Sequence, residues 1–168
     1  MLAELLAKQE ITEQIYRYCR AMDRMDRELG RKVWHEDGRA DYGTIFQGLG
    51  SEFITYVNEY HGSIIQHSHQ VSNILISVSG EAATSESYVT AALRFADGDR
   101  VMQATARGRY LDNWSFRDQR WAVDLRQYVH DFDDRREITE QRLPSGSYRD
   151  ERDPVYALER QLALEAHG

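Results

Sequence analysis

The fold of this chain is decided by residues 69–132, HQVSNILISVSGEAATSESYVTAALRFADGDRVMQATARGRYLDNWSFRDQRWAVDLRQYVHDF. Four strand-like runs make up this stretch, at 69–79, 83–96, 100–114 and 120–132, with turn-forming residues between them at 80–81, 97–99 and 117–119. Apolar and polar residues alternate within each run, as they do along a strand that buries one face. Because the connections are short, consecutive strands are expected to pair antiparallel. The stretch therefore predicts a meander.

The residues before the meander predict helices. Apolar residues recur mostly at three- and four-residue spacing, the period of a helix stripe, at Leu5, Ile11, Ile15, Tyr18, Met22, Met25 and Leu29. Gly30 is expected to end this helix. We expect a short second helix to hold Val33 and Trp34, followed by a turn at 36–38.

Two further elements connect these helices to the meander. A short hairpin around Gly43 is expected from the apolar residues Ala40, Tyr42, Ile45 and Phe46. A third helix is expected to be capped by Ser51, to bury Phe53, Ile54 and Val57, and to end at His61-Gly62. Helices followed by an antiparallel sheet indicate an α+β fold, with the helices packed on one face of a curved sheet.

The sequence becomes more polar after the meander. Residues 1–134 are expected to form one domain, and residues 135–168 a polar C-terminal extension that carries both prolines, Pro144 and Pro154. The last residues, from Val155, can form a short helix that docks on the body or on a neighbouring subunit.

Composition excludes several classes of function. The 168 residues carry a net charge of −7, which argues against binding to nucleic acid or to an anionic membrane. No apolar run approaches the ~18 residues of a membrane span, and the N-terminus does not resemble a signal peptide, so a cytoplasmic protein is expected. The single cysteine, Cys19, excludes an internal disulfide and a cysteine-based zinc site.

Two segments concentrate candidate site residues. Asp23 lies at the edge of the apolar stripe of the first helix, where it faces either solvent or a concave sheet. His67 and His69 share one face of a strand, which is also a metal-ligand spacing. No third ligand stands at a diagnostic spacing, so no metal is expected. Cys19 lies inside a helix, away from the N-terminus that would favour a thiolate, so it is not expected to be a nucleophile.

Three segments carry a resemblance to a known family. Residues 11–42, ITEQIYRYCRAMDRMDRELGRKVWHEDGRADY, resemble the opening of the SnoaL-like branch of the nuclear-transport-factor-2-like superfamily, and residues 69–88 and 109–133 resemble its sheet. The similarity in order and spacing extends over roughly residues 8–134. It implies a cone-shaped α+β barrel around a deep, largely apolar pocket, no cofactor, and a homodimer or homotrimer.

The resemblance also implies site residues. Scytalone dehydratases, bile-acid 7α-dehydratases and lindane dehydrochlorinases of this superfamily use an Asp–His dyad, which Asp23 and His69 match, with His67 as the alternative histidine. Tyr18 matches an assisting tyrosine, although it points about 140° away from Asp23 around the helix. Where the bile-acid enzymes carry an arginine, this chain has His130, which could protonate a leaving hydroxyl. Further pocket residues are expected to be Asn73, Tyr42, Trp34 and Tyr128.

These residues suggest proton-abstraction chemistry. A neutral imidazole accepts a proton at physiological pH, and a carboxylate on its other nitrogen fixes the tautomer and stabilises the imidazolium. The leading hypothesis is a cofactor-independent lyase or isomerase, dehydratase-like, acting on a hydrophobic, aromatic or polycyclic small molecule. The alternatives are a non-catalytic partner, such as the small β-subunit of a ring-hydroxylating dioxygenase, and a protein that binds a ligand without transforming it.

Overall fold

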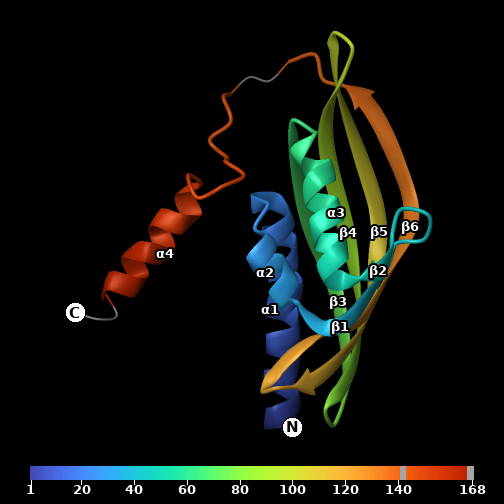
Figure 1. Cartoon of the computed structure of the whole chain (residues 1–168), viewed down its shortest axis with the longest axis vertical. Coiled ribbons are helices and arrows are strands. Elements are labelled where there is room, and N and C mark those ends of the chain that lie inside the picture. The colour runs from blue at the N-terminus through green and yellow to red at the C-terminus, as the bar shows by residue number, and fades with distance from the viewer. Residues whose placement is uncertain (141–142, 166–168) are drawn as a thin grey trace.

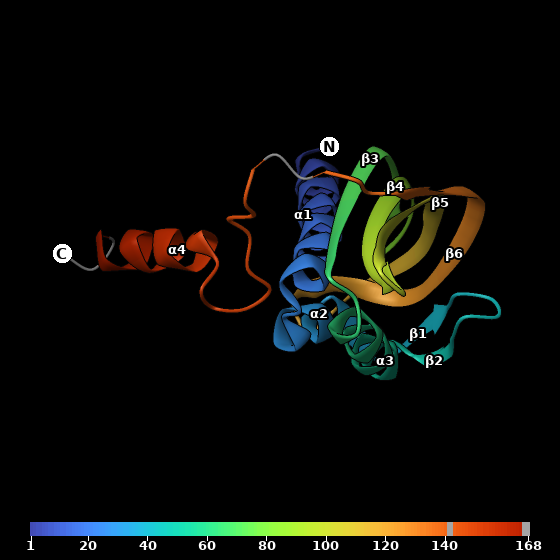
Figure 2. The ribbon, with the colours of Figure 1, turned by 90° about the horizontal axis from the view of Figure 1, so that it is seen from above.

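A strongly curved sheet with helices lying in its hollow makes up the body of the protein (Figures 1 and 2). The computed structural model describes residues 1–140 and 143–165. In chain order the elements are α1 (Leu2–Arg24), α2 (Arg27–Lys32), β1 (Trp34–Asp41), β2 (Gln47–Leu49), α3 (Gly50–Gly62), β3 (Gln66–Ser79), β4 (Ala82–Asp97), β5 (Arg100–Arg117), β6 (Arg120–Glu137) and α4 (Pro154–Glu165).

The six strands form one sheet in the order β2-β1-β6-β5-β4-β3. Strands β3 to β6 pair antiparallel, as the meander predicted, and β1 joins β6 in parallel. The predicted α+β class is therefore confirmed. The sheet does not close into a barrel, because β2 and β3 remain as separate edges, and the helices cover its concave side.

The first helical stretch is broken in two, which the sequence reading missed. Met25 adopts a left-handed conformation (φ 54°), so α1 ends before it. The carboxylate of Asp26 then accepts a hydrogen bond from the backbone N–H of Leu29 at 2.9 Å and caps α2. Gly30 was expected to end the helix, but it lies buried within α2 against Ile54.

The segment after α2 also differs from expectation. Trp34 opens β1 instead of ending a helix, and residues 36–38 belong to that strand. The pairing of β1 with β6 shifts between Trp34 and Arg39, so the turn-like residues produce an irregular strand in place of a turn. The hairpin around Gly43 is present, joining β1 to β2.

The third helix begins one residue before the expected cap. Ser51 lies inside α3, and the side chain of Glu52 accepts a hydrogen bond from the backbone N–H of Leu49 at 3.1 Å. Phe53 and Ile54 are buried as expected.

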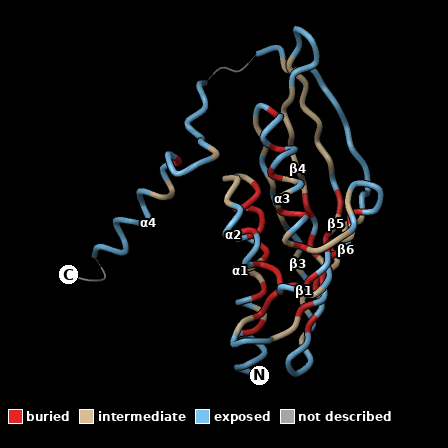
Figure 3. Tube along the Cα trace, in the orientation of Figure 1, coloured by how far each residue is buried: buried red, intermediate tan, exposed pale blue. Residues whose placement is uncertain are grey.

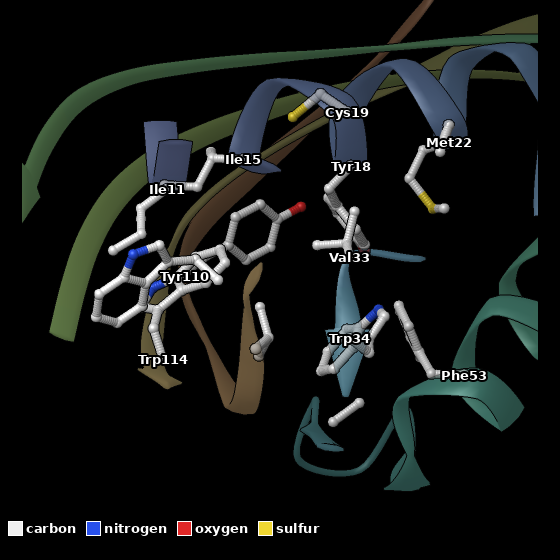
Figure 4. Close-up of a cluster of buried hydrophobic side chains, with 14 of the residues drawn as sticks. Ile11, Ile15, Tyr18, Cys19, Met22, Val33, Trp34, Phe53, Tyr110 and Trp114 are labelled. Atoms are coloured by element: carbon white, nitrogen blue, oxygen red, sulfur yellow. The ribbon is translucent and has the colours of Figure 1, made fainter. Parts of the chain in front are cut away.

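The hydrophobic core fills the space between α1, α3, β1 and the concave face of the sheet (Figures 3 and 4). The inward stripe of α1 supplies Ile11, Ile15, Tyr18 and Met22, and the sheet supplies Tyr110 and Trp114. The first residue of the predicted stripe, Leu5, is exposed, since the N-terminal turns of α1 extend past the core.

The chain leaves β6 and turns back toward α1 (Figure 1). We call residues 143–153 the strap. The strap ends where the guanidinium of Arg24 lies 3.2 Å from the carboxylate of Asp153, and α4 follows. Helix α4, where the sequence predicted a short helix, has no buried residue but contacts α1, because Arg20 pairs with Glu159 and lies over the ring of Tyr156. None of the helices in the described ranges combines the length and hydropathy that crossing a bilayer requires.

Candidate active site

Asp23 and His69 meet where the C-terminal turn of α1 packs against β3. The Nδ1 atom of His69 lies 2.8 Å from Oδ1 of Asp23. The backbone N–H of His69 also donates to both carboxylate oxygens, each at 3.0 Å. Because β3 is an edge strand, part of its amides have no partner strand, and Asp23 satisfies one of them. The carboxylate is thus held by the main chain as well as by the ring.

This geometry determines which nitrogen of His69 is basic. An ionised carboxylate only accepts hydrogen bonds, so Nδ1 of His69 carries the hydrogen that it donates to Asp23. In the neutral ring the lone pair is therefore on Nε2. The two side chains are largely but not completely covered, with 9% of His69 and 16% of Asp23 exposed.

Small residues lie next to His69 on the concave face of the sheet. His69 pairs with Ala91 on β4, and Ala91 pairs with Ala106 on β5. Side chains directly opposite one another on paired strands share a face of the sheet, so two methyl groups lie in the row that begins with the imidazole. The sequence places no bulky side chain in these two positions.

His67, the alternative histidine, is bound elsewhere. Its Nε2 lies 2.7 Å from the carbonyl oxygen of Met22, and because a carbonyl only accepts, Nε2 carries the hydrogen. Its ring stacks on that of His61, with centroids 4.0 Å apart. His67 therefore fastens β3 to the end of α1, while Asp23 pairs with His69.

His61 is a third imidazole that the sequence reading did not single out. It lies on α3, is only 3% exposed, and its ring centroid is 5.6 Å from that of His69. Burial, together with the neighbouring His67 and His69, lowers the pKa of His61 to about 2, so this ring is neutral. The available signal was its spacing from Ile54 and Asn58, which places it on the buried face of α3.

Tyr18 and Tyr42 are paired in the core. Their hydroxyl groups lie 2.9 Å apart, and burial raises the pKa of both well above the ordinary value, so both phenols are neutral. The ring of Tyr42 stacks on that of Phe53. It also stacks on the ring of Tyr128, with 5.4 Å between the two centroids. Tyr18 points to a different side of α1 from Asp23.

A buried ion pair lies beneath these tyrosines, and the sequence reading missed it too. The guanidinium of Arg126 donates to both oxygens of Asp112, at 2.7 and 2.8 Å, and both side chains are fully buried. The Cζ atom of Arg126 lies 4.2 Å from the ring centroid of Tyr18 and 4.1 Å from that of Tyr110. The alternation of Tyr110, Asp112 and Trp114 along β5 was the signal that Asp112 faces inward.

The contacts of the remaining sequence-predicted site residues are with residues other than Asp23 and His69. His130 is exposed on β6, with Nδ1 3.3 Å from the hydroxyl of Tyr128 and Nε2 3.6 Å from Asp133. Asn73 lies in an irregularity of β3 with a positive φ of 49° and is exposed. Trp34 is a core residue, with its ring against Gly50.

Two observations bear on what the site can bind. A surface groove of about 400 Å³ borders both Asp23 and His69, with Tyr16, Arg20 and Gln70 among its walls. Within residues 1–140 and 143–165, no three His, Cys, Asp or Glu side chains come together as a metal-binding group.

Comparison with known proteins assigns the chain to a family. Residues 3–127 match the model of the SnoaL-like domain. The chain belongs to the SnoaL-like family. No curated protein matches this SnoaL-like chain at the sequence level. The family match ends within β6, so the strap and α4 lie outside it.

Solved structures share the fold of this SnoaL-like protein at low identity. The Kfla4162 protein of Kribbella flavida is 15% identical with a TM-score of 0.70, over 78% of this chain and 95% of that one. A Novosphingobium aromaticivorans protein, provisionally named scytalone dehydratase, is 21% identical with a TM-score of 0.69, over 84% and 92%. The hexachlorocyclohexane dehydrochlorinase LinA-type3 of Novosphingobium barchaimii is 14% identical with a TM-score of 0.66, over 86% and 96%. The TM-scores establish a common fold.

Proposed function

We propose that this protein is a cofactor-independent lyase or isomerase in which Asp23 and His69 remove a proton from carbon in a hydrophobic small molecule. The observation that carries the proposal is the 2.8 Å contact between His69 Nδ1 and Asp23, reinforced by the backbone amide of His69. This contact leaves Nε2 as the base and holds the ring in one orientation, two requirements of general-base catalysis.

The chemical step follows from the position of the lone pair. Nε2 of His69 takes a proton from a carbon next to a carbonyl or an electron-poor ring, and Asp23 stabilises the resulting imidazolium. The electron pair of the broken C–H bond forms a C=C bond as a hydroxide or halide leaves from the neighbouring carbon. In a dehydration, a proton returned to the hydroxyl makes the leaving group water. If the proton is instead returned to another carbon, the same residues carry out an isomerisation.

The surroundings of the pair support an apolar substrate. Ala91 and Ala106 follow His69 across the sheet, and the aromatic rings of Tyr42 and Tyr128 stack further along the concave side. We assign His130 as the candidate for the second proton transfer.

The fold relatives fit this proposal. A SnoaL-like fold is shared with structures that carry the names scytalone dehydratase and hexachlorocyclohexane dehydrochlorinase. Both names describe an elimination, of water or of hydrogen chloride, and a base that removes a proton from carbon promotes such a reaction. For this chain the reaction class is a proposal that rests on its own Asp23–His69 geometry.

Hydrogen–deuterium exchange provides a direct test. The protein is incubated in D₂O with a panel of hydroxylated aromatic ketones and with hexachlorocyclohexane, and elimination products and deuterium at carbon are followed by NMR and mass spectrometry. We expect a substrate to be found whose turnover falls by about 10²–10⁴ in His69→Ala and Asp23→Asn. The matched control is Ser72→Ala, which changes an exposed residue of the same strand outside the groove that borders Asp23 and His69. Turnover of that substrate by His69→Ala at the wild-type rate would exclude the mechanism.

We also propose that the protein assembles as a homodimer or homotrimer through the convex face of the sheet. Leu75, Tyr88 and Leu125 are exposed there, on strands β3, β4 and β6. Apolar and aromatic side chains of this kind are those that form the centre of protein interfaces. Light scattering at micromolar concentration tests the assembly, and a monomer would refute it.

A further inference from the structure

The strap encloses a second groove at the β3 edge of the sheet. This strap groove has a volume of about 1,100 Å³ and lies between the strap, the end of α1 and the start of β3. Its wall includes Gln66 and Arg94, which are partners across β3 and β4. Successive residues of a strand face opposite sides, so Gln66 and Arg94 point away from the side on which His69 lies. The strap groove therefore extends to the side of the sheet away from His69, although Asp23 is also part of its wall.

The groove is rich in arginine. Six charged side chains line it: Asp23, Arg24, Arg94, Arg149, Asp150 and Arg152. Four positive charges against two negative ones contrast with the protein as a whole, whose net charge is −7. Arg24 is neutralised by Asp153 at 3.2 Å, but that pair lies at the end of the strap.

Arg149 is the central residue of this set. It is half-buried, and its Nη1 donates to the carbonyl oxygen of His61 at 2.6 Å, which fixes the strap to the end of α3. A carbonyl has no net charge, so this bond orients the guanidinium without neutralising it. Across the part of the chain that the structure describes, no carboxylate lies within ion-pair distance of Arg149.

The neighbouring arginine already holds an anion that belongs to the strap. Asp150 accepts hydrogen bonds from Nη2 and Nε of Arg152, at 2.6 and 2.8 Å. These bonds lower the pKa of Asp150 to about 2, so its carboxylate is charged at neutral pH. Asp150 therefore binds the guanidinium of Arg152 in the way that the carboxylate of a ligand would.

The wall also has apolar parts. Met25, Ile65, Leu143 and Tyr148 border the groove, and the ring of Tyr148 is 43% exposed. A ligand that used the whole groove would combine an anionic group for the arginines with an apolar body for these side chains. Guanidinium groups bind carboxylate, sulfonate and phosphate with the same paired N–H geometry.

We infer that the strap groove is a binding site for a small organic anion, whose charged group binds Arg149 and Arg152 and whose apolar body packs on Ile65 and Tyr148. Arg149, Arg152 and Tyr148 belong to the strap, beyond the 3–127 span of the family match, whereas Ile65 lies within that span. The two guanidinium groups of the site thus come from this chain's own C-terminal extension. Asp150 acts within the site as a competing anion that weakens ligand binding.

A pair of fluorescent probes tests the inference on the full-length protein. 8-Anilinonaphthalene-1-sulfonate carries a sulfonate, and N-phenyl-1-naphthylamine is its uncharged parent, so the difference between them isolates the charge. We expect the sulfonate probe to bind the wild-type protein more tightly than its parent. Arg152→Gln should weaken sulfonate binding about six-fold, as expected for the loss of a charge about 4 Å away in water. Asp150→Asn should strengthen it about three-fold, as expected for a charge about 6 Å away.

The controls separate a site from a general charge effect. Neither variant should change the affinity for the uncharged probe. Arg160→Gln, at an exposed position of α4, makes the same change in net charge as Arg152→Gln and should leave both affinities unaltered. Equal affinity of the wild-type protein for the two probes would overturn the inference. So would shifts of the same sign in Arg152→Gln and Asp150→Asn, or a loss in Arg160→Gln equal to that in Arg152→Gln.

Discussion

The carboxylate of Asp23 binds His69 through its backbone amide as well as through its ring. Both Asp23 oxygens lie 3.0 Å from the His69 nitrogen of the main chain, and Oδ1 lies 2.8 Å from Nδ1. One side chain of α1 thus fixes a strand and orients a base. The two tasks make different demands on the residue, and substitutions can separate them.

The anchoring task predicts a difference between two substitutions of Asp23. Asp23→Ala leaves the amide and the ring nitrogen of His69 without an acceptor, which should cost about 1–3 kcal/mol of unfolding free energy. Asp23→Asn keeps one acceptor oxygen and should cost less. Urea denaturation followed by tryptophan fluorescence measures both values. Equal losses in the two variants would show that the hydrogen bond to the main chain is not what stabilises this junction.

The buried pair of Arg126 and Asp112 predicts strong coupling. Arg126→Met leaves the Asp112 carboxylate in the core without a counter-charge and should lower the unfolding free energy by about 3–5 kcal/mol. The double variant Arg126→Met/Asp112→Leu removes both charges and should be more stable than the single one. A denaturant titration of the two variants gives the comparison. If the double variant were the less stable of the two, the unpaired charge would not be the cause of the loss.

The neutral ring of His61 predicts a dependence of stability on pH. Its pKa is about 2 in the folded protein and near 6.5 in the unfolded chain, so between these values the unfolded state binds more protons. The unfolding free energy should therefore fall as the pH is lowered from 7.5 to 4.5, by up to about 1.4 kcal/mol per pH unit from this residue.

His61→Leu should make this pH dependence shallower. The variant keeps the backbone carbonyl that binds Arg149, so the strap stays anchored while the titrating ring is removed. Denaturation series at several pH values compare the two slopes. An unchanged slope in His61→Leu would assign the acid sensitivity to other groups, of which His67 is the first candidate because burial also lowers its pKa.

The start of α3 predicts a position that tolerates no side chain. A Cβ atom at Gly50 would fall inside the van der Waals radius of the Trp34 ring. Gly50→Ala should therefore cost about 1–3 kcal/mol, the usual penalty of overpacking a core. Gly146→Ala is the matched control, because nothing lies within 4 Å of a Cβ atom built there. Thermal unfolding reports both, and equal melting temperatures would contradict the close packing of Trp34.

The end of the strap predicts an effect on α4. The carboxylate of Asp153 accepts hydrogen bonds from the amides of Val155 at 3.2 Å and Tyr148 at 3.1 Å, and it pairs with Arg24. Asp153→Ala removes this cap and should destabilise the helix by about 1 kcal/mol. Limited proteolysis should then cut within residues 143–153 faster than in the wild-type protein. Cleavage at the same rate would mean that Asp153 does not hold the strap.

Much of the sheet could be predicted because its signals are local. Alternation and short turns are properties of neighbouring residues, and they identified the four long strands and their antiparallel pairing. The break at Met25 could not be found in this way. It depends on one left-handed residue that is not glycine and on the cap formed by Asp26, whereas the apolar stripe continues through both.

The candidate site also depends on contacts that local sequence patterns do not encode. Asp23 and His69 were identified through a resemblance, and their contact spans 46 positions of the chain, which no local pattern encodes. Arg126 and Asp112 were missed because charged residues in a strand are usually solvent-exposed, and only the packing of Tyr18 and Tyr110 around the guanidinium makes this pair part of the core. His61 was taken only as the end of a helix.

Neither edge of the sheet is a long, open strand, and this limits how copies of this protein can associate. One edge is β3, whose open side is covered by α1 and whose amide at His69 is already bound to Asp23. The other edge is β2, a strand of three residues. A neighbouring chain therefore finds no long row of free amides and carbonyls to continue the ladder. The chain is protected against growing end to end into a continuous ribbon of strands, and its contacts with other copies must be made between faces.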